Sequence, residues 1–92
     1  MNRSILSIEH VGPVPRAYIL VGGYTREGAL SHAKKVSRVL RERLPTDHII
    51  PPTFLKFDPE TGKYIFRIIV YEFEDREHCK SVLAELALKG SV

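Results

Sequence analysis

Residues 63–73 constrain the fold more than any other part of the chain, because both alternating faces of this segment are apolar. The preceding Asp58-Pro59-Glu60-Thr61-Gly62 is typical of a tight turn, with Gly in the left-handed position, so residues 53–57 and 63–73 are expected to form a β-hairpin. One face of the returning strand carries Tyr64, Phe66, Ile68 and Val70; the other carries Ile65, Ile69, Tyr71 and Phe73, with Arg67 interrupting it. Helices can cover only one face, so the other must meet a second copy, a partner or nothing.

Local patterns predict four further elements. Residues 5–11 and 16–21 favour strands, and the short Gly-Pro-Val-Pro break between them favours an antiparallel hairpin. A helix is expected over about residues 26–44, after an N-cap at Thr25 and before Pro45, with Ala29, Ala33, Val36, Leu40 and Leu44 as its apolar stripe. A last helix is expected between a cap at Asp75 and Gly90, with Cys79, Val82, Leu83, Leu86 and Ala87 on one face. The pair Pro51-Pro52 excludes a central strand position for the connection before the hairpin.

The element order is therefore β-β-α-β-β-α, which predicts an α+β fold with a four-stranded antiparallel sheet and two helices on one face. Ninety-two residues make a single domain, 1–92. The lone cysteine excludes an intramolecular disulfide, and the first residues lack the apolar core of a signal peptide. No apolar run approaches the length of a membrane span, so a cytoplasmic protein is expected.

Positive charge is concentrated in the first part of the chain. Residues 1–56 hold nine Lys or Arg against four Asp or Glu, whereas residues 57–92 hold five against seven. On the first helix, one flank beside the apolar stripe is basic and consists of Lys34, Lys35, Arg38 and Arg41. We expect this basic flank to meet phosphates or an acidic protein surface, and a solvated helix face is the alternative. Arg26 lies off the flank and is a further binding candidate.

The sequence shows no pattern that indicates catalysis, a nucleotide site or a metal site. The glycines within residues 22–28 precede a helix but lack the Gly-Lys-Ser/Thr of a phosphate-binding loop, and a tight turn explains them. The four histidines have no zinc spacing, and no Ser/His/Asp or Cys/His arrangement suggests a nucleophile. A solvated strand end and an N-cap explain the acidic residues Glu72, Glu74, Asp75 and Glu77. We therefore expect a non-enzymatic binding protein with no catalytic residues, no metal and no cofactor.

The stretch Gly62-Lys63-Tyr64-Ile65-Phe66-Arg67-Ile68, followed by an acidic segment and a helix, resembles the second half of an RNA-recognition motif. Residues 18–23 resemble the first strand of that motif. Aromatic side chains on the family's central strands stack on bases, which would give Tyr64 and Phe66 this role. The family's last strand is missing after the second helix, and an extra strand precedes the first. The resemblance implies a module that binds single-stranded RNA.

In size, lone-domain character and its run from Met1 onward, the chain resembles small phage-encoded anti-CRISPR proteins, in particular those acting on the type I-F surveillance complex. This resemblance implies a stoichiometric inhibitor in the host cytoplasm that binds the CRISPR effector complex and blocks hybridisation of target DNA. The basic flank would then contact crRNA phosphates or acidic protein groups, and Tyr64, Phe66 and Arg67 would form the apolar part of the interface. The protein would act as a monomer or as a homodimer through the uncovered sheet face. A homodimer with only a structural role is the third interpretation.

Overall fold

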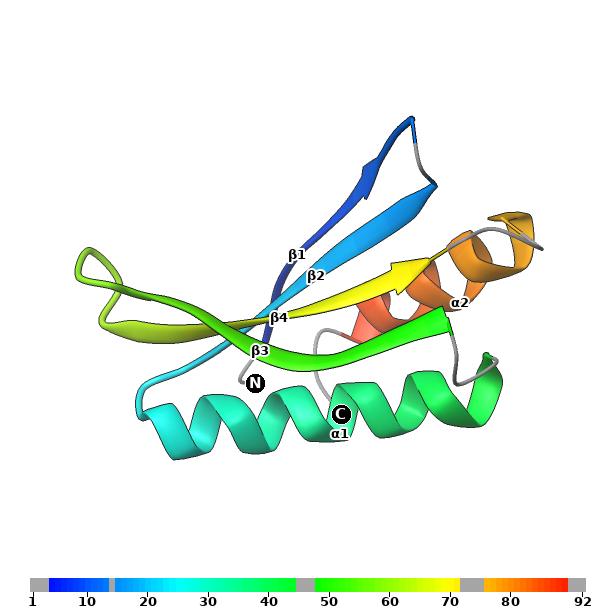
Figure 1. Ribbon diagram of the computed structural model, residues 1–92. Helices are drawn as coiled ribbons and strands as arrows, with labels where there is room; N and C mark the ends of the chain where they lie inside the picture. The colour runs from blue at the N-terminus through cyan, green and yellow to red at the C-terminus, as the bar shows by residue number, and fades with distance from the viewer. Residues whose placement is uncertain (1–3, 14, 45–47, 72–75, 90–92) are drawn as a thin grey trace.

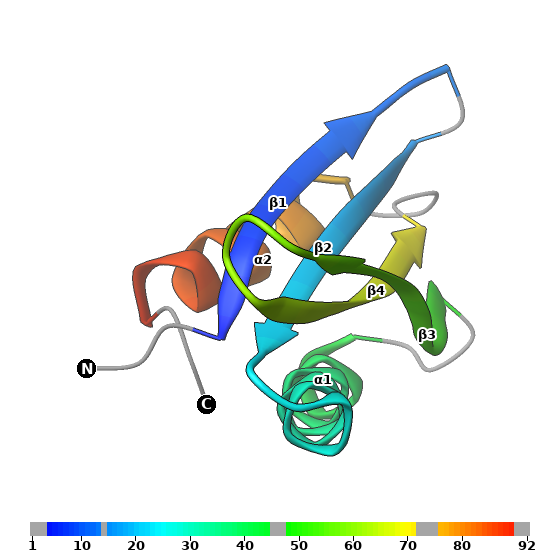
Figure 2. The ribbon, with the colours of Figure 1, turned by 90° about the vertical axis from the view of Figure 1, so that its left-hand side faces the viewer.

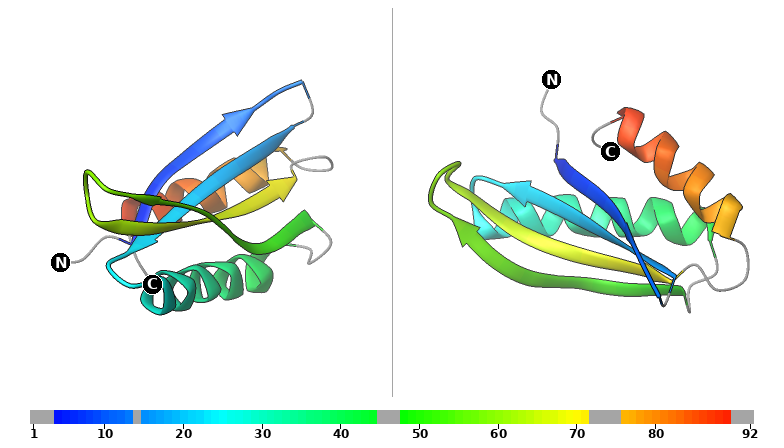
Figure 3. Two further views of the ribbon diagram at one scale, coloured as in Figure 1. Left: turned by 60° about the vertical axis from the view of Figure 1, so that its left-hand side comes forward. Right: turned by 90° about the horizontal axis from the view of Figure 1, so that it is seen from above.

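Six elements follow one another in the order that the sequence predicts (Figure 1). A computed structural model describes residues 4–13, 15–44, 48–71 and 76–89. The elements are β1 (Ile5–Val11), β2 (Arg16–Gly23), α1 (Arg26–Arg43), β3 (Ile49–Asp58), β4 (Lys63–Tyr71) and α2 (Arg76–Lys89). The strands form one antiparallel sheet and both helices lie on the same side of it (Figure 3), which confirms the predicted α+β fold. Several predictions fall on residues outside those described. They are the helix stop at Pro45, the strand end at Phe73, the cap at Asp75, the helix end at Gly90 and three of the four acidic residues around them.

The strand order in the sheet is β1-β2-β4-β3 (Figure 2). Strands β2 and β3 both run antiparallel to β4, which lies between them, so β2–α1–β3 is a split βαβ unit. A second such unit starting with β4 and α2 would place its closing strand beside β2 and parallel to β4. Strand β1 occupies this position in this direction. Strand β1 therefore takes the position that the closing strand of a second split βαβ unit would have.

The turn between β3 and β4 has the predicted chemistry. The backbone N–H of Gly62 donates to the carbonyl of Asp58 at 2.8 Å, and Gly62 has a φ of 72°. The Asp58 carboxylate accepts from the backbone N–H of Glu60 at 3.0 Å and from the Thr61 hydroxyl at 3.1 Å. Only glycine adopts this left-handed backbone without a steric cost, so the turn sets the register of the hairpin.

Strand β3 begins at Ile49, earlier than the predicted start at Thr53, and therefore includes both prolines. It is an edge strand, so residues without an N–H remove no bond from the interior of the sheet. The pairing with β4 is irregular between Ile50 and Thr53, where the prolines lie. The prediction that Pro51-Pro52 excludes a central position is confirmed.

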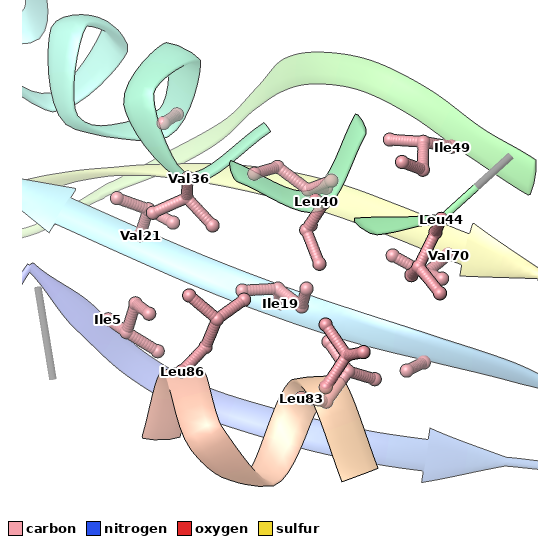
Figure 4. Packing of buried hydrophobic residues seen from close by; sticks show 14 of the residues in the cluster. Ile5, Ile19, Val21, Val36, Leu40, Leu44, Ile49, Val70, Leu83 and Leu86 are labelled. Carbon is pink, nitrogen blue, oxygen red and sulfur yellow. The ribbon is translucent and has the colours of Figure 1, made fainter. Parts of the chain in front are cut away.

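One hydrophobic core joins the helices to the sheet (Figure 4). All five residues of the predicted stripe on α1 are buried, together with Cys79, Val82, Leu83 and Leu86 of α2. The sheet contributes Ala17, Ile19, Val21, Phe66, Ile68 and Val70 from its two central strands. The prediction that Ala87 belongs to the buried face is wrong: Ala87 is exposed, because α2 packs along β1 at the border of the sheet.

Close packing, and not a turn, explains Gly23 at the end of β2. Neither Gly22 nor Gly23 has a positive φ. A Cβ on Gly23 would lie 2.7 Å from the backbone N of Ala29, in the first turn of α1. Thr25 caps this helix by accepting from the Gly28 N–H at 2.9 Å. The glycine therefore lets the helix start directly against the strand.

The C-terminal end of α1 contacts α2. The Arg43 guanidinium donates to the Glu85 carboxylate, and His78 Nε2 donates to the Arg43 carbonyl at 3.3 Å. The hydrogen bond to Glu85 raises the pKa of Arg43 above its ordinary value. None of the helices described is both long and apolar enough to cross a membrane.

Candidate functional site

No described helix covers the side of the sheet opposite α1 and α2 (right-hand view of Figure 3). We call it the open face. Strand register places on it Arg16, Tyr18 and Leu20 of β2, and Ile65, Arg67, Ile69 and Tyr71 of β4. Leu6 of β1 also packs there, since its side chain approaches Gly22. The open face is therefore apolar, with two arginines on its central strands.

Tyr18 is the centre of this surface. The guanidinium carbons of Arg16 and Arg67 lie 5.3 and 5.1 Å from the centroid of its ring. Arg16 Nε is buried and has no hydrogen-bond partner among the described residues. Cation–π contacts of this kind stabilise by about 0.5–1 kcal/mol at exposed sites. They hold two cations beside one aromatic ring on the uncovered side of the sheet.

Further aromatic and basic groups extend the open face toward the β3–β4 turn. Tyr24 is 71% exposed, and the Lys63 ammonium lies 5.5 Å from its ring centroid. Lys56 pairs with Ile65 and so lies on the same side. The acidic residues that register places there are Glu9, opposite Tyr18, and Asp58, which is bonded within the turn. Positive charge therefore predominates among the described residues of this face.

The structure places Tyr64 and Phe66 on the helix-covered face, away from the open face. Phe66 is 4% exposed and makes an edge-to-face contact with Phe54, with ring centroids 5.5 Å apart. Tyr64 packs against the core, with its ring centroid 4.8 Å from that of Phe57. Their strand neighbours on the same side are fully buried in the core, and alternation forces all of them to face α1 and α2. Of the three candidates predicted on this strand, only Arg67 reaches the open face.

The basic flank lies on the helix-covered side. Lys34, Lys35, Arg38 and Arg41 are all exposed, and Figure 2 views their helix nearly end-on. Lys34, Arg38 and Arg41 border a groove beside Pro51 and Pro52 of β3. Lys35 lines a neighbouring hollow that shares Lys34 and Arg38 with this groove and that Glu27 also lines. Arg26 lies over Phe54, with its guanidinium carbon 4.5 Å from the ring centroid. Of the predicted binding residues, only Arg67 therefore lies on the open face, and the basic flank lies on the other side of the sheet.

Sequence reasoning missed Arg16 and Tyr18. Their strand has one alternating set without polar residues (Ala17, Ile19 and Val21) and another that contains Arg16, so the arginine marks the uncovered side. Arg67 marks the same side on β4. The resemblance drew attention to Tyr64 and Phe66, whereas the charged residue of each strand pointed to the other face.

Among the residues that the structure describes, no group of three or more His, Cys, Asp or Glu side chains could hold a metal ion. Comparisons of the chain with protein-family models, curated protein sequences and solved structures find no match.

Proposed function

We propose that the protein binds single-stranded RNA on the open face and that it acts without catalysis. The observation that carries this proposal is the Tyr18 ring on a central strand, with the guanidinium groups of Arg16 and Arg67 beside it. Sequence-tolerant binding of single strands combines aromatic rings, on which bases stack, with positive groups that attract the backbone. The open face offers both in one place.

The topology supports the same proposal. With β1 in the position of the closing strand, the sheet has the four strands that the RNA-recognition resemblance implies. In this arrangement the stacking residue is Tyr18, in place of the predicted Tyr64 and Phe66. An extended RNA strand lying across β2 and β4 would contact Tyr18 and Arg67 together. Tyr18 and Ile69 are register partners, and Arg67 is two residues from Ile69 on β4.

Fluorescence anisotropy with a labelled single-stranded RNA of about eight nucleotides tests the proposal, with the duplex of the same sequence beside it. Stacking of one base is worth about 1–3 kcal/mol, so Tyr18→Ala should weaken binding roughly 5- to 150-fold. Tyr18→Phe keeps the ring and should bind nearly as the unaltered protein does. Equal losses for the two variants would contradict stacking on this ring.

Two arginines provide a matched control for charge. Arg67→Gln and Arg26→Gln each remove one cation that lies over an aromatic ring, but only Arg67 is on the open face. We expect Arg67→Gln to weaken binding about tenfold and to lower the salt dependence by about 0.7 in the log–log slope, as expected for one lost phosphate contact. Arg26→Gln should have a much smaller effect. Equal effects would mean that net charge attracts the RNA and that the open face does not bind it.

A second candidate function is inhibition of a crRNA-guided surveillance complex, as the anti-CRISPR resemblance implies. The observation that favours it is the free edge at β3, where Ile50, Phe54, Leu55 and Phe57 are each 37–46% exposed. Exposed apolar residues of this kind suit a protein partner, and the basic flank on α1 borders Pro51 and Pro52 of the same strand. Such an inhibitor would act in the cytoplasm, where the complex and its crRNA meet target DNA.

Size-exclusion co-elution distinguishes the two functions. The protein is run with a reconstituted type I-F crRNA–protein complex and, separately, with free crRNA. Migration with the complex alone supports the inhibitor and contradicts the RNA-binding module, and target DNA added before or after then shows whether hybridisation is blocked. Migration with free crRNA supports the RNA-binding module. Migration with neither, together with a mass that rises with concentration, overturns both functions in favour of a dimer through the open face.

A further inference from the structure

A groove at the β3 edge of the sheet lies between α1 and the first residues of β3. It has a volume of about 300 Å³. Its lining residues are Lys34, Ser37, Arg38, Arg41, Pro51 and Pro52. Three of the six carry a positive charge, and no acidic side chain among the described residues lines it. The groove is therefore a concentrated positive site with a defined shape.

Helix geometry brings the basic residues together. Lys34, Arg38 and Arg41 follow one another at spacings of four and three, so they lie on one side of α1 over two turns. Like charges at a spacing of four repel each other. On the other wall, Pro51 and Pro52 have no backbone N–H, so that part of β3 offers no main-chain donor. Side chains of α1 must supply the donors to any bound group.

Ser37 gives an independent observation in the same groove. Its side chain is 2% exposed, and its Oγ has no hydrogen-bond partner among the described residues. Buried hydroxyls are nearly always hydrogen-bonded, because an unpaired one loses its bonds to water without replacement. An acceptor oxygen that entered the groove would satisfy Ser37 and neutralise the repulsion among the three cations.

We infer that this groove binds a phosphate group, which accepts hydrogen bonds from Lys34, Arg38 and Arg41 and from the Ser37 hydroxyl. Arginine presents a planar set of donors that matches phosphate oxygens, and lysine adds a point charge. The phosphate belongs either to a nucleic-acid backbone or to a free phosphorylated compound. The inference stands on the groove residues alone and does not depend on the open face.

Inorganic pyrophosphate is the first probe, titrated into ¹⁵N-labelled protein and followed by the amide signals of α1 and Thr53. Lys34→Gln should weaken binding about tenfold and Ser37→Ala about three- to tenfold, as expected for one charged and one neutral hydrogen bond. Alanine is a better helix former than serine, so the Ser37→Ala protein should stay folded, and its amide spectrum reports this. If the amide shifts do not saturate below about 10 mM pyrophosphate, the inference is wrong.

Lys35→Gln is the matched control, because it removes the same charge from the same helix but outside the groove. It should weaken binding clearly less than Lys34→Gln does, because Lys35 does not line the groove. An equal loss of pyrophosphate affinity in Lys35→Gln and Lys34→Gln would show diffuse attraction to the charged helix. It would contradict a specific binding site in the groove. Tyr18→Ala should leave pyrophosphate binding unchanged, so failure of the groove and failure of the open face are separately visible.

A single-stranded RNA added to the pyrophosphate-bound protein identifies the source of the phosphate. If RNA displaces pyrophosphate, the α1 amide signals move to the positions that they have when RNA alone is bound. This result supports a backbone phosphate in the groove. Pyrophosphate that stays bound at saturating RNA supports a free phosphorylated compound as the occupant. Either result upholds a phosphate site, whereas a response confined to residues outside 34–41 and the start of β3 overturns it.

Discussion

The close approach of α1 to β2 makes Gly23→Ala a sharp test of the fold. A Cβ at this position would lie 2.7 Å from the backbone N of Ala29 and 2.9 Å from its Cα. Ordinary van der Waals contact begins at 3.4 Å, so the first turn of the helix would have to retreat by about 0.7 Å. Backbone atoms cannot rotate away as a side chain can, and Ala29 is fully buried. We expect the free energy of unfolding to fall by about 1–3 kcal/mol, the usual cost of overpacking.

Gly22→Ala is the matched control one residue earlier. Its Cβ would lie 2.8 Å from Leu6 Cδ1, but this atom ends a flexible side chain that is 39% exposed and can move. The backbone at Gly22 suits any residue, and replacing glycine by alanine at such a position restricts the unfolded chain, which stabilises by about 0.4–1 kcal/mol. The two effects should nearly cancel for Gly22→Ala.

Urea unfolding followed by circular dichroism measures both variants against the unaltered protein. The expected result is a clearly lower midpoint for Gly23→Ala, a midpoint near that of the unaltered protein for Gly22→Ala, and a shared slope. Equal midpoints for the two variants would refute the argument that the helix start is packed against the strand.

Three further predictions concern the core, the turn and the helix contact. Leu40→Ala should lower the free energy of unfolding by about 2–5 kcal/mol, because Leu40 is fully buried in the core; urea unfolding measures this, and a loss below 1 kcal/mol would contradict it. Gly62→Ala should cost about 1–2 kcal/mol in the same assay, because only glycine adopts its φ of 72° freely, and an unchanged midpoint would mean that the turn has another backbone. The hydrogen bond to Glu85 raises the pKa of Arg43. The stability that this contact contributes is therefore present below the ordinary arginine pKa and is lost only as the pH rises through the raised pKa. The difference in melting temperature between Arg43→Gln and the unaltered protein should therefore stay constant from about pH 6 to 9, and a difference that changes within this range would show another titrating group.

The local patterns of the chain determined its elements. The spacing of Ala29, Ala33, Val36 and Leu40 made α1 amphipathic, and all four are buried. The residues from Asp58 to Gly62 specified a turn that forms with the expected hydrogen bonds and backbone. These features depend on residues that are close together in the sequence, so they can be predicted from the sequence alone. The basic flank was found in the same way, because helix geometry alone places its four residues together.

Tertiary structure decided which of the two apolar faces of β4 became the core. Alternation separates Phe66 from Arg67, and the charge of Arg67 favours the uncovered side, but the side to which the β2–α1–β3 connection crosses fixes which face the helices cover. The same connection put the basic flank and Arg67 on opposite sides of the sheet and left Tyr18 on the open face. The pairing of β1 with β2, in contrast, is the local hairpin that the sequence predicted. Sequence therefore determined the pieces and their chemistry, whereas the packing of distant segments determined which side chains share a surface.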